Sequence, residues 1–277
     1  MTATSAPPAV SGPTGRLRRL QMSALARRVM IGLLLLAGWQ VAVMVSGVEP
    51  LLVPSPVDIA SALVEDTLSL EIVTATGFTL RTLVIGTVVG MAIGLVLATI
   101  AVLWRAGHDL LTLLVSLLNP LPSIAILPLA MIWFGLTPTA IVVVILNSTV
   151  WPIALNADMG FRTISPTLQR AARTLGIRGL RMVWQVLLPA ALPHLLSGVR
   201  IAWAFAWRTV VAAELVFGVA GGTGGLGFYI NQSRYFLETD SVFAGLVVIS
   251  ALGLLIEVVF GFIERRTVER WGMTKAS

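Results

Sequence analysis

The chain has 277 residues, of which 57% are hydrophobic and 12% are charged, and its mean hydropathy is +0.92. These values exclude a soluble globular domain and predict an all-α integral membrane protein. The chain has no cysteine, and its two histidines, His108 and His194, lie far apart, so we expect neither disulfides nor a metal site. The formal charge of +6 comes from cations that flank apolar runs, which indicates membrane topology and not nucleic-acid binding.

The N-terminal part of the chain contains a leader, a first span and an acidic segment. Residues 1–28 are polar and basic, and we expect a disordered cytoplasmic leader. The apolar run at residues 29–48 lacks a convincing cleavage site, so we interpret it as a retained transmembrane helix. Residues 49–78 carry acidic side chains and no Lys or Arg, which places them outside. Within them, Ser55 and Asp58 predict the N-cap and first turn of a short amphipathic helix.

Five further spans are expected at residues 79–264, and the second and third spans of the chain carry distinctive patterns. The second span, at about residues 79–104, contains Gly86, Gly90 and Gly94 at intervals of four. This ladder favours close helix packing over a pore-lining face. The third span, at about residues 110–133, is interrupted by several prolines. A helix broken at membrane depth is a candidate for lining a transport path.

The remaining spans are predicted at about residues 140–155, 195–219 and 241–263, followed by a basic tail at residues 265–277. Fifteen of the nineteen cations fall in the segments that this map places inside. Six spans with both termini in the cytoplasm therefore satisfy the positive-inside rule.

The loop between the fourth and fifth spans, residues 156–193, contains a basic stretch at residues 170–189 that has no acidic side chain. Small residues within it would let a partner surface approach closely, and Pro189 is expected to end a helix before the next apolar run. We interpret this stretch as a cytoplasmic docking element. The alternative is an ordinary basic loop of the kind that the positive-inside rule requires.

The spacing of residues in this stretch resembles the E-A-A-x-x-x-G signature, ending in I-x-L-P, of permease subunits in ABC-type importers. The matching positions are Ala171, Ala172, Gly176, Val186, Leu188 and Pro189. Residues 52–57, 119–136 and 187–193 also look like the nitrate/sulfonate/taurine branch of that family. One departure is Arg170, which stands where the family has glutamate, so a partner ATPase would need a compensating acid.

The resemblance implies a six-helix fold like that of type I ABC importer permeases, in the bacterial plasma membrane. It also implies two cytoplasmic ATPase subunits that bind ATP and Mg, a second permease copy, expected to be identical, and an external substrate-binding protein. This chain would then be non-catalytic and hold no cofactor. The residues expected to couple to the ATPase are Arg170, Ala171, Ala172, Arg173, Leu175, Gly176 and Pro189. The glycine-rich residues 221–227 are not a phosphate loop, because they lack its lysine and are placed outside.

The fifth span carries charged residues that are candidates for the path of a small anion such as a sulfonate, taurine or nitrate. Arg208 suits an oxyanion, although it would also fit a structural role in a pair with Glu214 or Glu257. Because Glu214 lies on a different helical face from Arg208, we expect it to brace the outer gate region. Arg200 lies near the inner end, where its side chain is expected to reach the membrane surface.

Polar side chains in the third and fourth spans, Asn119, Ser123 and Asn147, are further candidates for the path, and interhelical hydrogen bonds explain them equally well. The alternative function is a stand-alone secondary transporter or channel. Such a protein would need acidic groups in its spans, for which Glu214 and Glu257 are available, and its halves would show internal repetition. No such repetition is visible in this sequence.

Overall fold

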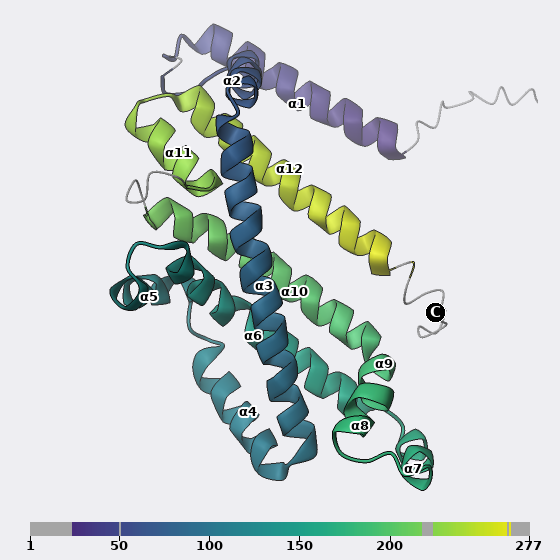
Figure 1. The fold of residues 1–277 in the computed structure, drawn as a ribbon. Coiled ribbons are helices and arrows are strands. Elements are labelled where there is room, and N and C mark those ends of the chain that lie inside the picture. The colour runs from purple at the N-terminus through teal and green to yellow at the C-terminus, as the bar shows by residue number, and fades with distance from the viewer. Residues whose placement is uncertain (1–23, 50, 218–223, 265, 267–277) are drawn as a thin grey trace, which may run out of the picture.

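The computed structural model describes residues 24–264, apart from residue 50 and residues 218–223, together with residue 266. Within this part of the chain every regular element is a helix (Figure 1), which confirms the all-α prediction. Most of the predicted leader and tail lie outside the described residues, as do residues 221–223 of the glycine-rich loop.

The long helices are α1 (Ala24–Ser46), α3 (Glu71–Leu103), α6 (Pro138–Thr163), α10 (Leu192–Phe217) and α12 (Thr239–Glu264). The shorter elements are α2 (Pro56–Leu68), α4 (Arg105–Leu118), η1 (Ser123–Ile126), α5 (Leu127–Phe134), α7 (Pro166–Thr174), α8 (Leu180–Met182), η2 (Val183–Leu187), α9 (Leu188–Ala190) and α11 (Leu226–Tyr235).

All five long helices are long and apolar enough to cross a membrane. A sixth crossing is obtained when α4 is joined with η1 and α5, which follow it after a short break and are bent away from it by 87°. The six-helix prediction is confirmed when this pair counts as one span. The third span is thus broken, as its prolines indicated, and the break is a sharp turn.

Two long helices extend beyond the predicted spans. Helix α3 begins at Glu71, because Ile72 and Ala75 already pack against α11. Helix α6 continues to Thr163, where Ala157 and Phe161 still belong to a buried apolar cluster. The last turns of α6 therefore occupy the beginning of the segment that was predicted as a loop at residues 156–193.

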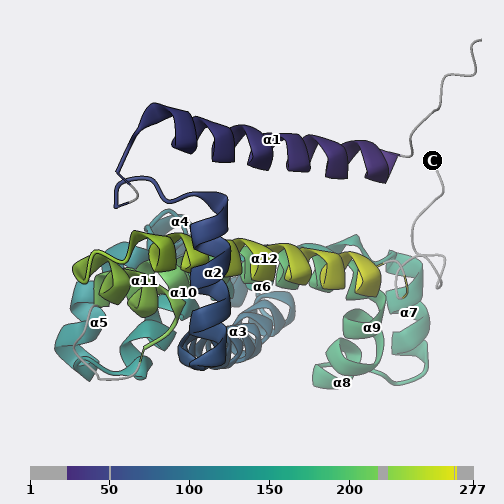
Figure 2. The same cartoon turned by 90° about the horizontal axis from the view of Figure 1, so that it is seen from above.

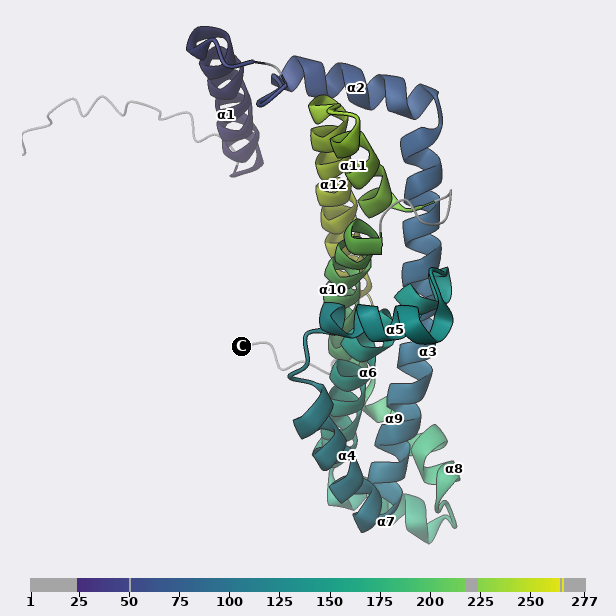
Figure 3. The ribbon, with the colours of Figure 1, turned by 90° about the vertical axis from the view of Figure 1, so that its left-hand side faces the viewer.

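Helix α6 is the centre of the bundle and packs against α3 and α10 (Figure 3). Of its most apolar window, 67% is buried, against none of the corresponding windows in α1 and α12. Pro152 lies inside α6, and the side-chain amide of Asn156 donates a hydrogen bond to the Pro152 carbonyl at 2.8 Å.

The glycine ladder of α3 is the surface that receives α6. The α6 side chains that lie against Gly86, Gly90 and Gly94 are, in that order, Ile145, Thr149 and Ile153. A β-carbon at Gly86 would lie 2.5 Å from Cγ2 of Ile145, far inside normal contact. Because an α6 side chain fills the space beside each glycine, the ladder is a packing surface, as predicted.

Helix α2 crosses the bundle at the end opposite α7, and α1 lies apart from the other long helices (Figures 2 and 3). The predicted N-cap Ser55 is present at the start of α2, and with Asp58 it forms a capping box: the Asp58 amide donates to Ser55 Oγ at 3.3 Å, and the Ser55 amide donates to Asp58 Oδ2 at 2.9 Å. Helix α1 contacts α12 through the rings of Trp39 and Phe243, whose centroids are 5.9 Å apart.

Candidate functional site

The basic segment predicted from the sequence forms a separate helix, α7, at one end of the bundle (Figure 1). Ser165 caps its start, with Oγ accepting a hydrogen bond from the Leu168 amide at 3.3 Å. Ala172 is buried in the cluster that α3, α6 and η2 form, so it fastens α7 to the bundle. The start of α7 is therefore capped by Ser165, and its second half is held by packing against the bundle.

The backbone conformation at the end of α7 favours glycine at position 176. The Gly176 amide donates to the Arg173 carbonyl and the Ile177 amide donates to the Ala172 carbonyl, both at 3.0 Å. This pair of bonds is a Schellman motif, in which the residue after the C-cap is left-handed, and φ of Gly176 is +80°. A β-carbon there would meet nothing within 4 Å, so the glycine also leaves the surface open.

The surface around α7 is both basic and apolar. Arg170, Arg173, Arg178 and Arg181 are exposed and form no ion pair within the described residues. Large apolar side chains are exposed beside them, with Leu175 80% and Trp184 65% accessible. A protruding surface of this kind is typical of a contact site for another protein.

The predicted helix boundary at Pro189 is wrong. Pro189 lies inside α9, which continues directly from η2, and the helix is interrupted at Ala191. The reason is that η2 is a π-helical turn just before Pro189, in which the Leu188 amide donates to the Val183 carbonyl five residues earlier. Pro189 itself is exposed.

A polar cluster braces the end of α6 next to α7. Arg162 Nε donates to Asp158 Oδ2 at 2.8 Å, and Arg162 Nη2 lies 2.7 Å from His108 Nδ1 on α4. His108 Nδ1 is also 3.8 Å from the Asp158 carboxylate. The sequence analysis missed this cluster, because nothing local indicates that His108 and the end of α6 meet.

Two of the predicted path residues meet at the break in the third span. Asn147 Nδ2 donates to Ser123 Oγ at 3.2 Å and to the Leu121 carbonyl at 3.3 Å. Asn147 Oδ1 accepts from Trp151 Nε1 at 3.1 Å. Asn119 lies at the exposed end of α4, and no side-chain hydrogen bond is found for it among the described residues.

Glu214 is 2% exposed and binds the start of α11 to two long helices. Its carboxylate accepts from the Thr79 hydroxyl, 3.0 and 2.8 Å from the two carboxylate oxygens, and from the Gly227 amide at 3.0 Å. The Leu226 amide donates to Thr79 Oγ1 at 2.8 Å. Helix α11 has no cap from its own N-cap residue, Gly225, so side chains from α3 and α10 supply the cap.

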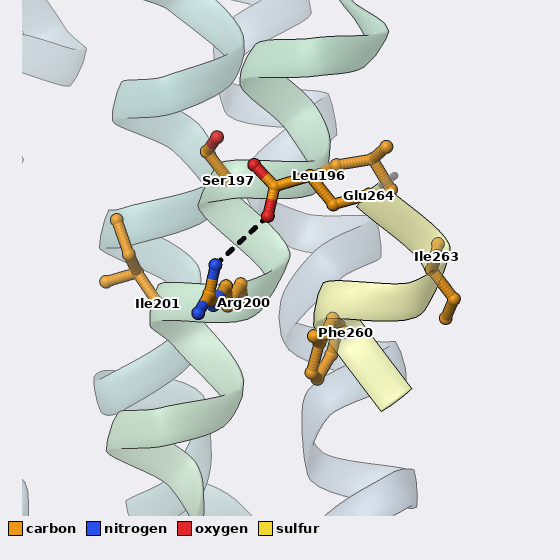
Figure 4. A pocket seen from close by; sticks show the side chains of 7 residues that line it. All are labelled: Leu196, Ser197, Arg200, Ile201, Phe260, Ile263 and Glu264. Carbon is orange, nitrogen blue, oxygen red and sulfur yellow. Dashed lines mark hydrogen bonds and ion pairs between the residues drawn. The ribbon is translucent and has the colours of Figure 1, made fainter. Parts of the chain in front are cut away.

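Arg208 is exposed and borders a cavity of about 240 Å³ between α10 and α12, together with Trp203 and Trp207. Neither Glu214 nor Glu257 pairs with it. Glu257 is bound to Arg200, which also donates to Glu264 at 3.0 Å (Figure 4). Two acids on α12 therefore hold Arg200, and one of them, Glu264, is the last residue of that span, so the expectation that Arg200 reaches the membrane surface stays a prediction.

These residues thus form separate groups. No hydrogen bond or ion pair within the described residues joins Arg208 to the Asn147 and Ser123 pair or to the Glu214 and Thr79 pair. The arrangement is a bundle of apolar spans with few internal charges, which lie in separate contacts between helices, and one protruding basic segment. This is the architecture of a membrane permease component.

The chain belongs to the family of binding-protein-dependent transport system inner membrane components, whose model matches residues 90–269. It is 38% identical over 153 residues to the taurine transport system permease protein TauC of Escherichia coli K12, covering 55% of this chain and 54% of TauC. It is 30% identical over 244 residues to the putative aliphatic sulfonates transport permease protein SsuC of Bacillus subtilis 168, covering 87% of each chain.

The nitrate import permease protein NrtB of Leptolyngbya laminosa is 29% identical over 181 residues, which cover 65% of this chain and 62% of NrtB. The motif-based resemblance to ABC-type permeases of the nitrate/sulfonate/taurine branch is therefore confirmed. The chain is a multi-pass protein of the inner membrane.

Proposed function

We propose that this chain forms the translocation path of an ATP-driven importer for a small anion, such as a sulfonate, taurine or nitrate, and couples that path to a cytoplasmic ATPase through residues 170–189. The substrate class is supported by the names of the relatives. The observation that carries the coupling is the α7 surface, where exposed arginines and exposed Leu175 lie within the segment that carries the permease signature.

The arginine-rich end of the bundle would face the cytoplasm, by the positive-inside rule. Two ATPase subunits, which bind ATP and Mg, would contact Arg170, Ala171, Leu175 and the open surface over Gly176 on each of two permease copies. The second copy would be identical, and an external binding protein would deliver the anion at the end that carries α2 and α11. Catalysis of ATP hydrolysis would then belong entirely to the partner.

Coupling would use the connections of α7. Only Ile164 and Ser165 separate α7 from the end of α6, and α8 to α9 lead from it into α10. A displacement of α7 on ATP binding would therefore reach both central helices without passing through a long flexible loop. Rocking of these helices would open the path alternately to the two sides.

Within the path, Arg208 is our candidate for contact with the anion. Its guanidinium suits an oxyanion, and it is exposed beside a cavity. Glu257 lines the same cavity but pairs with Arg200, and no acid among the described residues forms an ion pair with Arg208. Asn147, Ser123 and Asn119 would line the path at the break of the third span. Glu214 would hold α11 at the outer gate.

The coupling is tested with Gly176→Arg, which places a large cation on the proposed docking surface. The expected result is loss of ATPase copurification and of substrate-stimulated ATP hydrolysis, with normal membrane insertion. Gly135→Arg is the matched control, because φ of Gly135 is also positive, at +68°, and its surroundings are also open. Full ATPase binding by Gly176→Arg would overturn the docking proposal.

The substrate is tested by reconstituting the chain in lipid with its ATPase and binding protein and adding candidate anions one at a time. Stimulation of ATP hydrolysis by one anion would identify the cargo. Equal basal turnover with every anion would place the substrate outside this class. Failure of the wild-type chain to assemble with any ATPase would instead favour the stand-alone carrier.

A further inference from the structure

A cavity of about 520 Å³ lies between the end of α3 and the segment that runs from α7 to η2. Its floor is apolar: Met182, Val183 and Leu187 are buried and belong to the same cluster as Ala172. Val102 and Leu103, the last residues of α3, add an apolar wall. The cavity is therefore part of the packed bundle and not a gap between loops.

The rim of this cavity is cationic. Arg173 and Arg178 line it, and neither forms an ion pair within the described residues. The third polar side chain is Gln169, one turn before Arg173, whose Nε2 donates to the Ile164 carbonyl at 3.2 Å. No carboxylate lines the cavity. Two guanidinium groups without a counter-charge are a site for an oxyanion, and their planar forks match a phosphate well.

The position of the cavity indicates the source of the phosphate. Helix α3 is a membrane span, and it ends at Leu103 in the cavity wall. The next residue, Trp104, is 66% exposed, and exposed tryptophan at the end of a span is typical of the interface between bilayer and water. The cavity therefore lies at the depth of the lipid headgroups.

We propose that this cavity binds the headgroup of an anionic phospholipid, with the phosphate on Arg173 and Arg178 and the glycerol ester region on the apolar floor. A free inorganic anion would use the arginines and leave the apolar floor uncovered, as would an acidic side chain of a partner protein. A choline or ethanolamine headgroup would bring a third cation beside the two guanidinium groups, so a net negative lipid is favoured. Basic pockets between spans recognise anionic headgroups in this way.

Such a lipid would add a further contact between α7 and the end of α3. The inference rests on the cavity and its charges, and it holds whatever protein docks on the exposed side of α7. It concerns the face of α7 that carries Gln169 and Arg173, whereas Arg170 and Arg181 do not line the cavity.

The test compares two double variants of the full-length chain, each with two charges removed from the same segment. Arg173→Gln with Arg178→Gln changes the cavity, and Arg170→Gln with Arg181→Gln changes exposed positions outside it. Each purified chain is titrated with phosphatidylglycerol and with phosphatidylcholine in detergent, and bound lipid is counted by native mass spectrometry. At roughly three- to fivefold per arginine, the cavity variant should bind phosphatidylglycerol roughly 10- to 30-fold more weakly, and the control should bind nearly as wild type.

Equal losses in both double variants would show general attraction between charges and overturn the site. So would equal binding of the two lipids by the wild-type chain. A competition arm uses the unaltered chain, so it does not depend on how the variants fold. Displacement of phosphatidylglycerol by millimolar inorganic phosphate would assign the cavity to a free anion, and displacement by the purified ATPase would assign it to the protein partner; either result would refute the lipid site.

Discussion

The Thr79 hydroxyl and the Glu214 carboxylate are hydrogen-bonded across 135 positions of sequence, 3.0 and 2.8 Å from the two carboxylate oxygens. One belongs to the early part of α3 and the other to the last turn of α10. Together they cap α11, because each accepts one of its first amide hydrogens. Three helices therefore meet at a single buried carboxylate.

Removal of that carboxylate should loosen α11. We expect Glu214→Ala to lower the free energy of unfolding by about 1–3 kcal/mol, because it leaves buried donors without an acceptor. Hydrogen exchange of the α11 amides should accelerate along with a lower melting temperature in detergent. Glu214→Gln keeps an acceptor oxygen, so its melting temperature and exchange rates should lie between those of Glu214→Ala and the wild type. If Glu214→Ala melts and exchanges like the wild type, the buried cap contributes nothing to stability.

The glycine ladder allows a comparison within one helix. A β-carbon at Gly90 would overlap the Thr149 side chain, whereas one at Gly77 would meet nothing within 4 Å. Gly90→Ala should therefore destabilise the chain by about 1–3 kcal/mol through overpacking. Gly77→Ala should be neutral or slightly stabilising, since alanine is the better helix former. Thermal unfolding of the two variants in the same detergent distinguishes them, and equal melting temperatures would contradict the packing of α3 on α6.

Asn147 should keep the chain well ordered at the break in the third span. Its side-chain amide holds the Leu121 carbonyl and the Ser123 hydroxyl. We expect Asn147→Ala to cost about 1–2 kcal/mol and to increase protease cleavage and hydrogen exchange at residues 119–126. Asn119→Ala is the control, because the Asn119 side chain is exposed and makes no hydrogen bond in the described part of the chain. Similar protection in both variants would mean that the break is held by its prolines alone.

The start of α2 should depend on pH. Hydrogen bonds with the side chain and the backbone amide of Ser55 lower the pKa of Asp58 below its usual value. A depressed folded-state pKa stabilises the cap above the unfolded-state pKa, and this contribution is lost as the pH falls through the folded-state value. The wild type should therefore melt at a higher temperature than Asp58→Asn near neutral pH, and the difference should shrink in acid below about pH 4. A difference that stays constant on acidification would rule out the ionised carboxylate as its source.

Features that depend on neighbouring residues could be predicted from the sequence. The cap of α2 follows from Ser55 and Asp58 three positions apart, and the break of the third span follows from its prolines. The ladder of three glycines indicated a packing surface, although its partners on α6 could not be named. In each case the physical cause lies within one or two helical turns of the residues concerned.

Features that depend on distant residues could not be predicted. Arg200 is held by two acids on α12, 57 and 64 positions away, and no local pattern in the sequence indicated this pairing. Thr79 gave no local sign that it would meet Glu214. Pro189 was taken as a helix end by a local rule, but a π-helical turn before it carries the helix past that point. Tertiary packing decides such cases, because local patterns in one sequence do not show which helices pack together.

Pro152 gives α6 one mechanically weak point between its two functional ends. About 22 Å of helix, at 1.5 Å per residue, separates Asn147 at the broken span from Arg162 beside α7. Proline supplies no amide hydrogen, so the carbonyl of Ser148 lacks its usual helical partner there. This point lies between Thr149 and Ile153, which sit on the glycines of α3. In the proposed coupling, α6 would act as a lever that pivots on the glycine ladder, and the turn that lacks this hydrogen bond lies at the pivot.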